Sequence, residues 1–210
     1  MAQTAETVHH PLFARLYMRT AASDEGEYRR ELLAGLTGEV IEVGAGHGLN
    51  FAFYPEAVER VLAVEPERLL REAATEAAVK APVEVDVVDG VAGQLPAADE
   101  SFDAGVASLV LCSVSDQQRA LAELRRVIRP GGALHFYEHV VAHRAAGRRL
   151  QRFADATFWP RVAGGCHLSR DTGAAIEQAG FEIQTSRRFG FSPGPPVPAI
   201  PHILGVARRP

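Results

Sequence analysis

The stretch that decides the fold is Glu42-Val-Gly-Ala-Gly-His-Gly48, a glycine-rich turn that directly follows the apolar run at residues 40–43. Glycine lets the backbone turn sharply after a strand and lets a ligand approach the backbone closely. The glycines are spaced GxGxG, whereas dinucleotide-binding units have GxGxxG. A strand followed by this turn predicts the first βα unit of an α/β domain that binds a nucleotide-like ligand.

Strand-like and helix-like segments alternate around this turn. Apolar runs predict strands at residues 40–43, 61–64, 83–88, 104–112 and 133–141. Apolar residues at helical spacing predict helices from about residue 49, through 69–78, and at 117–128. Such alternation predicts a Rossmann-like α/β fold, in which a mostly parallel sheet has helices on both faces.

The segments before and after this alternation predict additional helices and two further strands. Two helices are expected within residues 9–36, and further elements are expected as helices at 143–158 and 170–179 and as strands from Phe181 and around 203–207. Prolines between residues 192 and 201 predict a rigid loop, because proline fixes φ and removes a donor. We expect one domain over 1–210, divided into a helical lid at 1–36, a cofactor-binding half at 37–141 and a substrate-side half at 142–210.

Two carboxylates favour a cationic nucleoside as the ligand. Glu42 lies two residues before Gly44, where its charge would repel a pyrophosphate but would attract an ammonium and a sulfonium. Glu65 ends the second predicted strand, the position from which an acid accepts ribose hydroxyls in nucleotide-binding βαβ units. S-adenosyl-L-methionine carries all of these groups, so it is the predicted cofactor, with S-adenosyl-L-homocysteine as its product.

Composition excludes several other classes of function. The chain has 210 residues and a net charge of −4, which offers no general attraction for nucleic acid. Lys80 is the single lysine, so a Walker lysine and the Tyr-x-x-x-Lys pair of short-chain dehydrogenases are both missing. We therefore expect a small-molecule methyl acceptor as the partner and no nucleic acid.

Cysteine usage and hydropathy bear on the compartment. Cys112 and Cys166 are far apart in the sequence and form no CxxC pair, which predicts reduced thiols with neither a disulfide framework nor a metal site. No apolar stretch approaches the roughly 18 residues that span a bilayer, and no secretion signal is recognisable. These features predict a cytoplasmic protein without stable membrane insertion.

With these motifs placed, the sequence resembles class I S-adenosylmethionine-dependent methyltransferases. The shared stretches are Ile41-Glu-Val-Gly-Ala-Gly-His-Gly48, Leu95-Pro96 with Asp99 to Asp103, and Leu124-Arg-Arg-Val-Ile-Arg-Pro-Gly-Gly132. It is similar in particular to the methyltransferase-like group that includes alkyl-thiol S-methyltransferases. That resemblance rests on Gly48-Leu-Asn-Phe-Ala-Phe-Tyr-Pro55, Leu109-Val-Leu-Cys-Ser-Val114, Tyr137-Glu-His-Val140, Gly165-Cys-His-Leu-Ser-Arg170 and Pro201-His-Ile-Leu-Gly205.

The resemblance implies a seven-stranded sheet with an antiparallel last strand, and methyl transfer to a thiol. The cofactor-binding residues that we expect are Tyr17, Glu42, Gly44, Ala45, Gly46, Asn50, Glu65, Pro66, Ala92, Ser108 and Leu109. This chain departs from some relatives in two ways. It begins with a polar-to-amphipathic segment where they carry a hydrophobic membrane anchor, and His47 replaces a commoner threonine in the glycine turn.

Methyl transfer to a thiol needs a thiolate, and an unperturbed thiol of pKa about 8.5 is only a few per cent ionised at pH 7. A histidine that accepts the proton would supply it. His139 is the catalytic candidate because it lies near the carboxyl edge of the sheet, where open α/β sheets bind ligands. Trp159, Cys166 and His167 are expected on the substrate side.

Structural roles for these residues and other functions for the chain stay open. His139 would equally suit a structural role, bonded to Glu138 or to the backbone, and Trp159 would equally suit a core position. O- or C-methylation of a natural product or quinone is the second functional hypothesis, because it would use the same cofactor half. A non-catalytic cofactor-binding scaffold is the third hypothesis.

Overall fold

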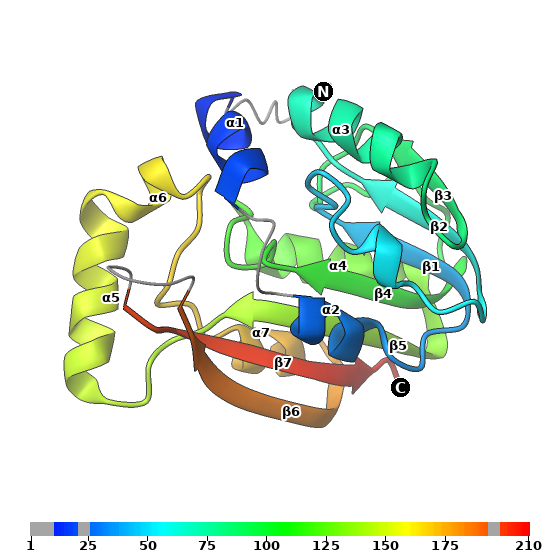
Figure 1. Ribbon diagram of the computed structural model, residues 1–210. Coiled ribbons are helices and arrows are strands. Elements are labelled where there is room, and N and C mark those ends of the chain that lie inside the picture. Colours follow the sequence, from blue (N-terminus) through cyan, green and yellow to red (C-terminus); the bar gives the residue numbers. More distant parts are fainter. Residues whose placement is uncertain (1–10, 21–25, 193–197) are drawn as a thin grey trace, which may run out of the picture.

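The computed structural model describes residues 11–20, 26–192 and 198–210, and their centre is one seven-stranded sheet (Figure 1). The strand order is β3-β2-β1-β4-β5-β7-β6. The strands are β1 (Gly38–Val43), β2 (Val58–Val64), β3 (Glu84–Val88), β4 (Phe102–Ser108), β5 (Ile128–His139), β6 (Glu182–Phe191) and β7 (Ile200–Arg208). Strands β1 to β5 are parallel, and β7 runs antiparallel to both β5 and β6. The expected sheet, including its antiparallel last strand, is confirmed.

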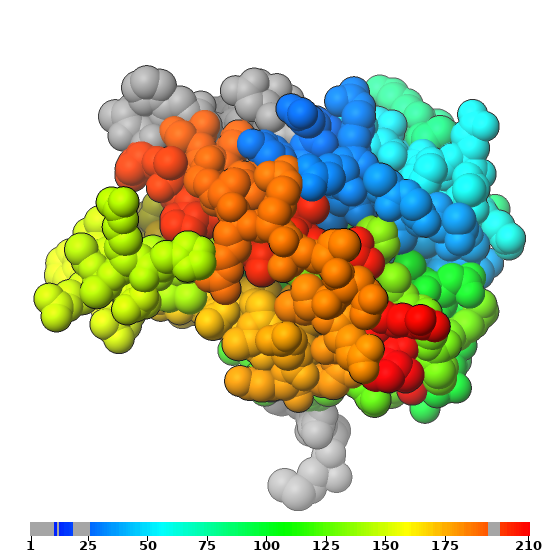
Figure 2. All heavy atoms as spheres, turned by 90° about the horizontal axis from the view of Figure 1, so that it is seen from below, coloured from blue at the N-terminus to red at the C-terminus, as the bar shows by residue number. Residues whose placement is uncertain are grey.

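Helices cover both faces of the sheet. They are α1 (Pro11–Thr20), α2 (Gly26–Leu33), α3 (Arg68–Ala78), α4 (Gln117–Val127), α5 (Ala145–Thr157), α6 (Trp159–Val162) and α7 (Thr172–Gln178), with a 3-10 turn η1 (Phe51–Phe53). Figure 1 shows α2 in front of the sheet and α4 and α7 behind it. Figure 2 shows β6 and α7 side by side, with α5 projecting beside them.

The side chains along each strand point alternately to the two faces of the sheet, and a separate hydrophobic core lies on each face. In β1, Ile41 packs in one core with Leu121 of α4 and Ile176 of α7. Val40 faces the opposite way and packs in the other core with Leu33 of α2. Because successive side chains of a strand point to opposite faces, a central strand covered on both sides needs apolar residues at consecutive positions. This requirement explains the unbroken apolar runs in the sequence.

The helix expected from about residue 49 is absent, and that prediction is wrong. Only the single 3-10 turn η1 forms there, and Tyr54 is already extended, with φ −62° and ψ 131°. Pro55 disfavours a helical conformation at the residue before it. Since Gly48 stands only a few residues earlier, the segment is too short for an α-helix.

The fourth strand was expected to continue to residue 112, but it ends at Ser108. Leu109 has φ 58°, an uncommon left-handed conformation for a residue with a Cβ, and it turns the chain out of the sheet. Its N–H still donates to the Tyr137 carbonyl, at 2.7 Å. Residues 109–113 therefore form a loop over the carboxyl edge of β4 and β5.

The region before β1 is helical as expected, in α1 and α2, while residues 1–10 and 21–25 of the predicted lid lie outside the described residues. Most of the predicted proline loop, residues 193–197, also lies outside them. Within the described part of the chain, no helix combines the length and apolar character needed to cross a membrane.

The segment after α6 packs closely against the loop after β4. Gly165 has φ 88°, and a Cβ placed on it would lie 2.9 Å from the Ser113 carbonyl oxygen. Both the backbone angle and the short approach therefore require glycine. Gly35 has a similar φ of 78°, but a Cβ there would meet nothing within 4 Å.

We expect Gly165→Ala to destabilise the protein more than Gly35→Ala does. Both substitutions force a Cβ into the left-handed region, at a cost of roughly 1 kcal/mol. At Gly165 the Cβ also meets a backbone oxygen that cannot rotate away, which adds about 1–3 kcal/mol. Urea unfolding of the two variants measures the difference, and equal losses would contradict the close packing of these loops.

Candidate active site

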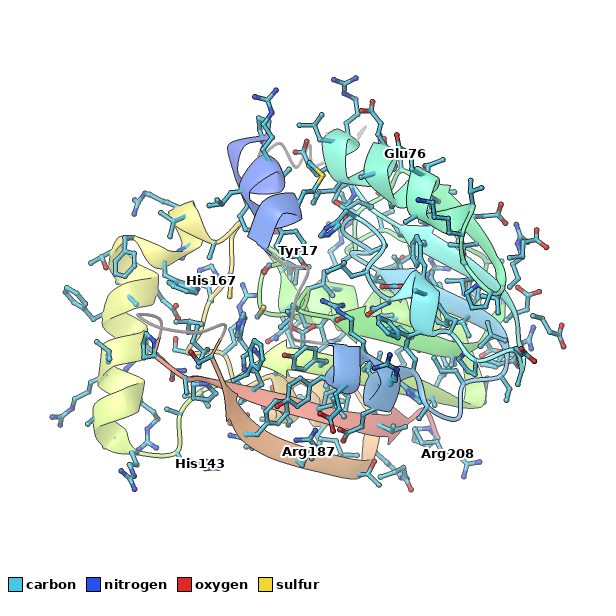
Figure 3. All side chains as sticks on the ribbon, in the orientation of Figure 1. Tyr17, Glu76, His143, His167, Arg187 and Arg208 are labelled. Atoms are coloured by element: carbon cyan, nitrogen blue, oxygen red, sulfur yellow. The ribbon has the colours of Figure 1, made fainter. Side chains whose placement is uncertain are left out.

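The predicted site residues meet at the carboxyl edge of the parallel strands. The glycine turn follows β1, Glu65 follows β2, Ser108 ends β4 and His139 ends β5. Figure 3 shows Tyr17 of α1 and His167, from the segment after α6, beyond the tips of β4 and β5. Open α/β sheets bind ligands outside this edge. The fold thus gathers residues from both halves of the chain at one place.

The glycine turn is held to β2 by its own backbone. The N–H groups of Gly44 and Ala45 both donate to the Val64 carbonyl, at 2.8 and 3.2 Å. Gly44 has φ 66°, and a Cβ on it would lie 2.4 Å from Val110 Cγ2, so glycine lets the turn pack against the loop after β4. These two amides are therefore used to build the turn.

Tyr17 lies over this turn. Its ring meets the His47 ring edge-on, with centroids 5.1 Å apart, and stacks on Phe13 at 5.5 Å. A Cβ on Gly46 would lie 3.5 Å from Tyr17 Cε1. Helix α1 therefore covers the glycine turn through Tyr17.

Glu42 is buried and fully engaged by neighbouring side chains. Asn50 Nδ2 donates to Oε1 at 2.7 Å, and Tyr54 Oη donates to Oε2 at 2.8 Å. Arg29 of α2 in turn donates to Asn50 Oδ1 at 2.7 Å. Burial raises the pKa of Glu42 to about 7, against the opposing effect of these hydrogen bonds. The sequence singled out Glu42 and Asn50 but missed Tyr54 and Arg29, which complete the network.

Glu65 joins the glycine turn to the segment after β2. Its Oε2 accepts the Gly46 N–H at 2.8 Å, and its Oε1 accepts the Glu67 N–H at 2.9 Å. Arg71 supports the same segment by donating to the carbonyls of Glu65 and Pro66. Burial raises the pKa of Glu65 to about 7.

Two polar atoms beside the turn and β4 fit a bound ligand. His47 Nδ1 and Ser108 Oγ are buried and have no hydrogen-bond partner among the described residues. Buried polar atoms are normally paired, so an unpaired one at a sheet edge indicates a partner that is supplied from outside the chain. Ala92, another of the expected cofactor-binding residues, lies half-buried in a turn closed by a bridge between Val91 and Gln94.

The loop after β4 is fixed by one buried carboxylate. Glu138 Oε1 accepts the N–H groups of Val110 and Leu111, at 3.0 and 2.8 Å, and Oε2 accepts that of Cys112, at 3.1 Å. Burial raises the pKa of Glu138, while these backbone donors oppose the rise. Sequence reasoning weighed Glu138 only as a partner for His139. The signal that could have identified it is an acidic residue near the end of a central strand.

His139 lies against two cysteines. Its Nδ1 is 3.4 Å from Cys112 Sγ and 3.2 Å from Cys166 Sγ, and the two sulfurs are 3.6 Å apart. Both cysteines are free and buried. The hydrogen bond to the Cys166 thiol, together with burial, raises the pKa of Cys112 well above its usual range. Cys112 is therefore a buried thiol that lies against a second thiol and an imidazole.

Of the other predicted substrate-side residues, Trp159 packs against the two cysteines, whereas His167 is hydrogen-bonded to its own loop. Trp159 packs beside the two cysteines with Ala163, Leu168 and Ile200, and its Nε1 is buried without a partner among the described residues. His167 is turned to its own loop, because its Nδ1 donates to the Gly165 carbonyl at 2.8 Å. Its backbone N–H donates to the Cys112 carbonyl, also at 2.8 Å, and so joins the two loops.

Comparison with known proteins identifies the family of the chain. Residues 41–136 match the methyltransferase domain family. The chain is 37% identical to mouse thiol S-methyltransferase TMT1B over 183 residues, which are 83% of this chain and 73% of that protein. It is 36% identical to rat TMT1B over 211 residues, covering 93% and 84% of the two chains. A methyltransferase structure from Bacillus halodurans superimposes with a TM-score of 0.73 at 18% identity, covering 89% of this chain and all of the other.

The fold and the site define an S-adenosylmethionine-dependent methyltransferase of class I. The chain belongs to this family, in the group that includes the thiol S-methyltransferases TMT1A and TMT1B.

We propose that Glu65 accepts the cofactor's ribose hydroxyls as a carboxylate, which makes binding dependent on pH. With a pKa of about 7, Glu65 is increasingly protonated below that value, and a protonated acid no longer accepts through both oxygens. The affinity for S-adenosylhomocysteine should therefore rise with pH through 7, and it should be about tenfold weaker at pH 6 than at pH 8. Calorimetric titration at the two values measures the change.

Two variants test the assignment. Glu65→Gln should bind more weakly at pH 8, by roughly 1.5–3 kcal/mol as expected for hydrogen bonds to a charged group, and its affinity should not depend on pH. Glu42→Gln is the matched control, because Glu42 also has a pKa of about 7. If the pH dependence disappears in Glu42→Gln and persists in Glu65→Gln, Glu65 is not the titrating acceptor.

Proposed function

We propose that this enzyme transfers the methyl group of S-adenosylmethionine to the sulfur of a small apolar thiol. The observation that carries the proposal is the position of His139, at the carboxyl edge of β5 beside an apolar wall that includes Trp159 and Leu168. The identity to thiol S-methyltransferases over most of the chain supports it independently.

On the donor side, the proposed cofactor contacts come from β1 and the glycine turn after it, the ends of β2 and β4, the turn after β3, and α1. These residues are Tyr17, Glu42, Gly44, Ala45, Gly46, Asn50, Glu65, Pro66, Ala92, Ser108 and Leu109. Glu42 would act through Asn50, because it already accepts hydrogen bonds from Asn50 and Tyr54. Tyr17 would close over the cofactor, since its ring already lies on His47 and Gly46.

On the acceptor side, we assign thiol activation to His139 and its surroundings. The methyl transfer is an in-line displacement, so the sulfur must be ionised and aligned behind the methyl carbon with water excluded. Trp159, Cys166 and His167 would shape the substrate side, with Trp159 as apolar wall and His167 holding the loop. A small-molecule acceptor, rather than nucleic acid, suits the net charge of −4. We also propose that the enzyme acts in the cytoplasm.

The acceptor class can be tested with S-adenosylmethionine, two alkyl thiols of pKa near 8.5 and 10, and a phenol, with methylated products measured by mass spectrometry. We expect both thiols to react. His139→Ala should lower thiol methylation about 10²–10⁴-fold at neutral pH, the usual contribution of a group that helps ionise the nucleophile. The loss should shrink as the pH rises past the thiol's own pKa, since hydroxide then supplies the thiolate.

A purely structural histidine gives a different profile. Its loss would lower the activity by the same factor for both thiols across pH 6 to 10, and that result would contradict the role of His139. Turnover of the phenol with no turnover of either thiol would contradict the acceptor itself. His143→Ala is the control, because His143 is exposed on the connection between β5 and α5.

A further inference from the structure

We propose that Cys112, His139 and Cys166 bind one divalent metal ion of the class that prefers thiolate ligands, with Zn²⁺ as the natural candidate. This site is contrary to the expectation from the sequence, in which the two cysteines are 54 residues apart. In the folded chain, one ligand atom from each of the three residues lies within 4.8 Å of the others.

The triangle formed by the three ligand atoms has nearly the dimensions of one face of a zinc tetrahedron. Bond lengths of about 2.3 Å to sulfur and 2.0–2.1 Å to nitrogen place two sulfurs about 3.8 Å apart, and a sulfur and a nitrogen about 3.6 Å apart. The corresponding distances here are 3.6 Å between the sulfurs and 3.4 and 3.2 Å from the sulfurs to His139 Nδ1. A metal ion would enter with small outward shifts of the three side chains.

The backbone holds the ligands from three separate segments. Cys112 N–H donates to Glu138, and Cys112 carbonyl accepts the His167 N–H, so both peptide groups of Cys112 are fixed. Cys166 follows Gly165, whose positive φ lets its loop reach Ser113. His139 is the last residue of β5. Metal sites whose ligands are oriented by such surrounding hydrogen bonds are preorganised for the ion.

Two other arrangements explain less of the geometry. A disulfide would account for two neighbouring sulfurs, but it gives no reason for an imidazole nitrogen at a similar distance from both of them. Two neutral thiols beside an imidazole would place three weakly bonded polar groups against Trp159 and Leu168, which offer little compensation. A divalent cation with two thiolates and a neutral imidazole has no net charge, which suits an apolar surrounding.

Three protein ligands leave the fourth tetrahedral position open, as in catalytic zinc sites. We infer that the acceptor thiol occupies it, an inference that rests on the proposed function. The thiol releases its proton to solvent as its sulfur binds the metal. A lone pair of that sulfur then forms the bond to the methyl carbon while the sulfonium C–S bond breaks, and its electron pair stays on S-adenosylhomocysteine. The neutral thioether leaves the metal, and His139 acts as a ligand rather than a base.

The metal site is tested first, without substrate, by elemental analysis of the purified full chain and by titration of metal-free protein with Co²⁺. We expect one metal ion per chain, and a thiolate-to-cobalt charge-transfer absorption that saturates at one equivalent. Cys112→Ser, Cys166→Ser and His139→Gln should each weaken Co²⁺ binding by at least about 100-fold, the upper end of the loss seen for outer-shell partners. His143→Gln, at an exposed histidine, should bind Co²⁺ like the wild type.

Several results overturn the site. One is wild-type protein that binds S-adenosylhomocysteine but shows no charge-transfer absorption with Co²⁺. Another is equal Co²⁺ affinity in the wild type and all three variants. A third is freshly purified, metal-free protein in which mass spectrometry finds a Cys112–Cys166 disulfide. Circular dichroism of each variant identifies those that have not folded. If none of the variants folds, the presence or absence of the charge-transfer absorption in wild-type protein with Co²⁺ still tests the metal site.

A second measurement separates this inference from the proposed function. Adding an alkyl thiol to the Co²⁺ protein should increase the charge-transfer absorption, because one more sulfur binds the metal. Full thiol turnover by metal-free enzyme would overturn the metal's role and leave thiol methylation standing. A saturable Co²⁺ site in a protein that methylates only the phenol would instead overturn thiol methylation and leave the metal site standing.

Discussion

The loop after β4, where we propose that the acceptor binds, depends on one interaction, the hydrogen bonding of the Glu138 carboxylate to three consecutive backbone N–H groups. A chain that leaves a parallel sheet carries amides that lose their ladder partners, and buried amides need acceptors. Glu138 lies in the neighbouring strand and supplies them without solvent. The loop can therefore stay buried while the chain leaves the sheet at Leu109 and Cys112 is directed at His139.

Two more buried carboxylates hold the segments around the glycine turn. Glu65 accepts a hydrogen bond from the Gly46 N–H, and Glu42 accepts hydrogen bonds from the side chains of Asn50 and Tyr54. Each carboxylate is buried and each has a pKa raised to about 7, so the segments around the glycine turn are held by groups whose pKa lies near neutrality. The glycine turn and the loop after β4 meet where Gly44 packs on Val110, which makes them a single packed unit.

Much of the fold could be predicted because it depends on local patterns. The alternation of apolar runs and helical spacing predicted the five parallel strands, and the segments after it predicted the other two. The glycine turn and Glu65, which the sequence singled out together, are joined by a hydrogen bond. The errors arose where one residue overrode a pattern, since Pro55 prevents a helix after the glycine turn and Leu109 ends β4 early. The grouping of Cys112, His139 and Cys166 could not be predicted, because it depends on how two loops pack against each other. The sequence marked His139 and Cys166 as separate candidates, and the GlyGly pair before Cys166 and the acid at Glu138 were further signals.

The most direct test of this account is the Glu138→Gln variant, assayed for S-adenosylhomocysteine affinity and for kcat/KM with an alkyl thiol. Glutamine can keep its oxygen on the Val110 and Leu111 amides, but its NH2 group then faces the Cys112 N–H. We expect cofactor affinity to stay within about threefold, because Glu42 and Glu65 are untouched, and kcat/KM to fall about 10²-fold through misplacement of Cys112 and its neighbours. Unchanged kcat/KM in a folded variant, or an equal loss of cofactor binding, would contradict the claim that Glu138 organises the acceptor side.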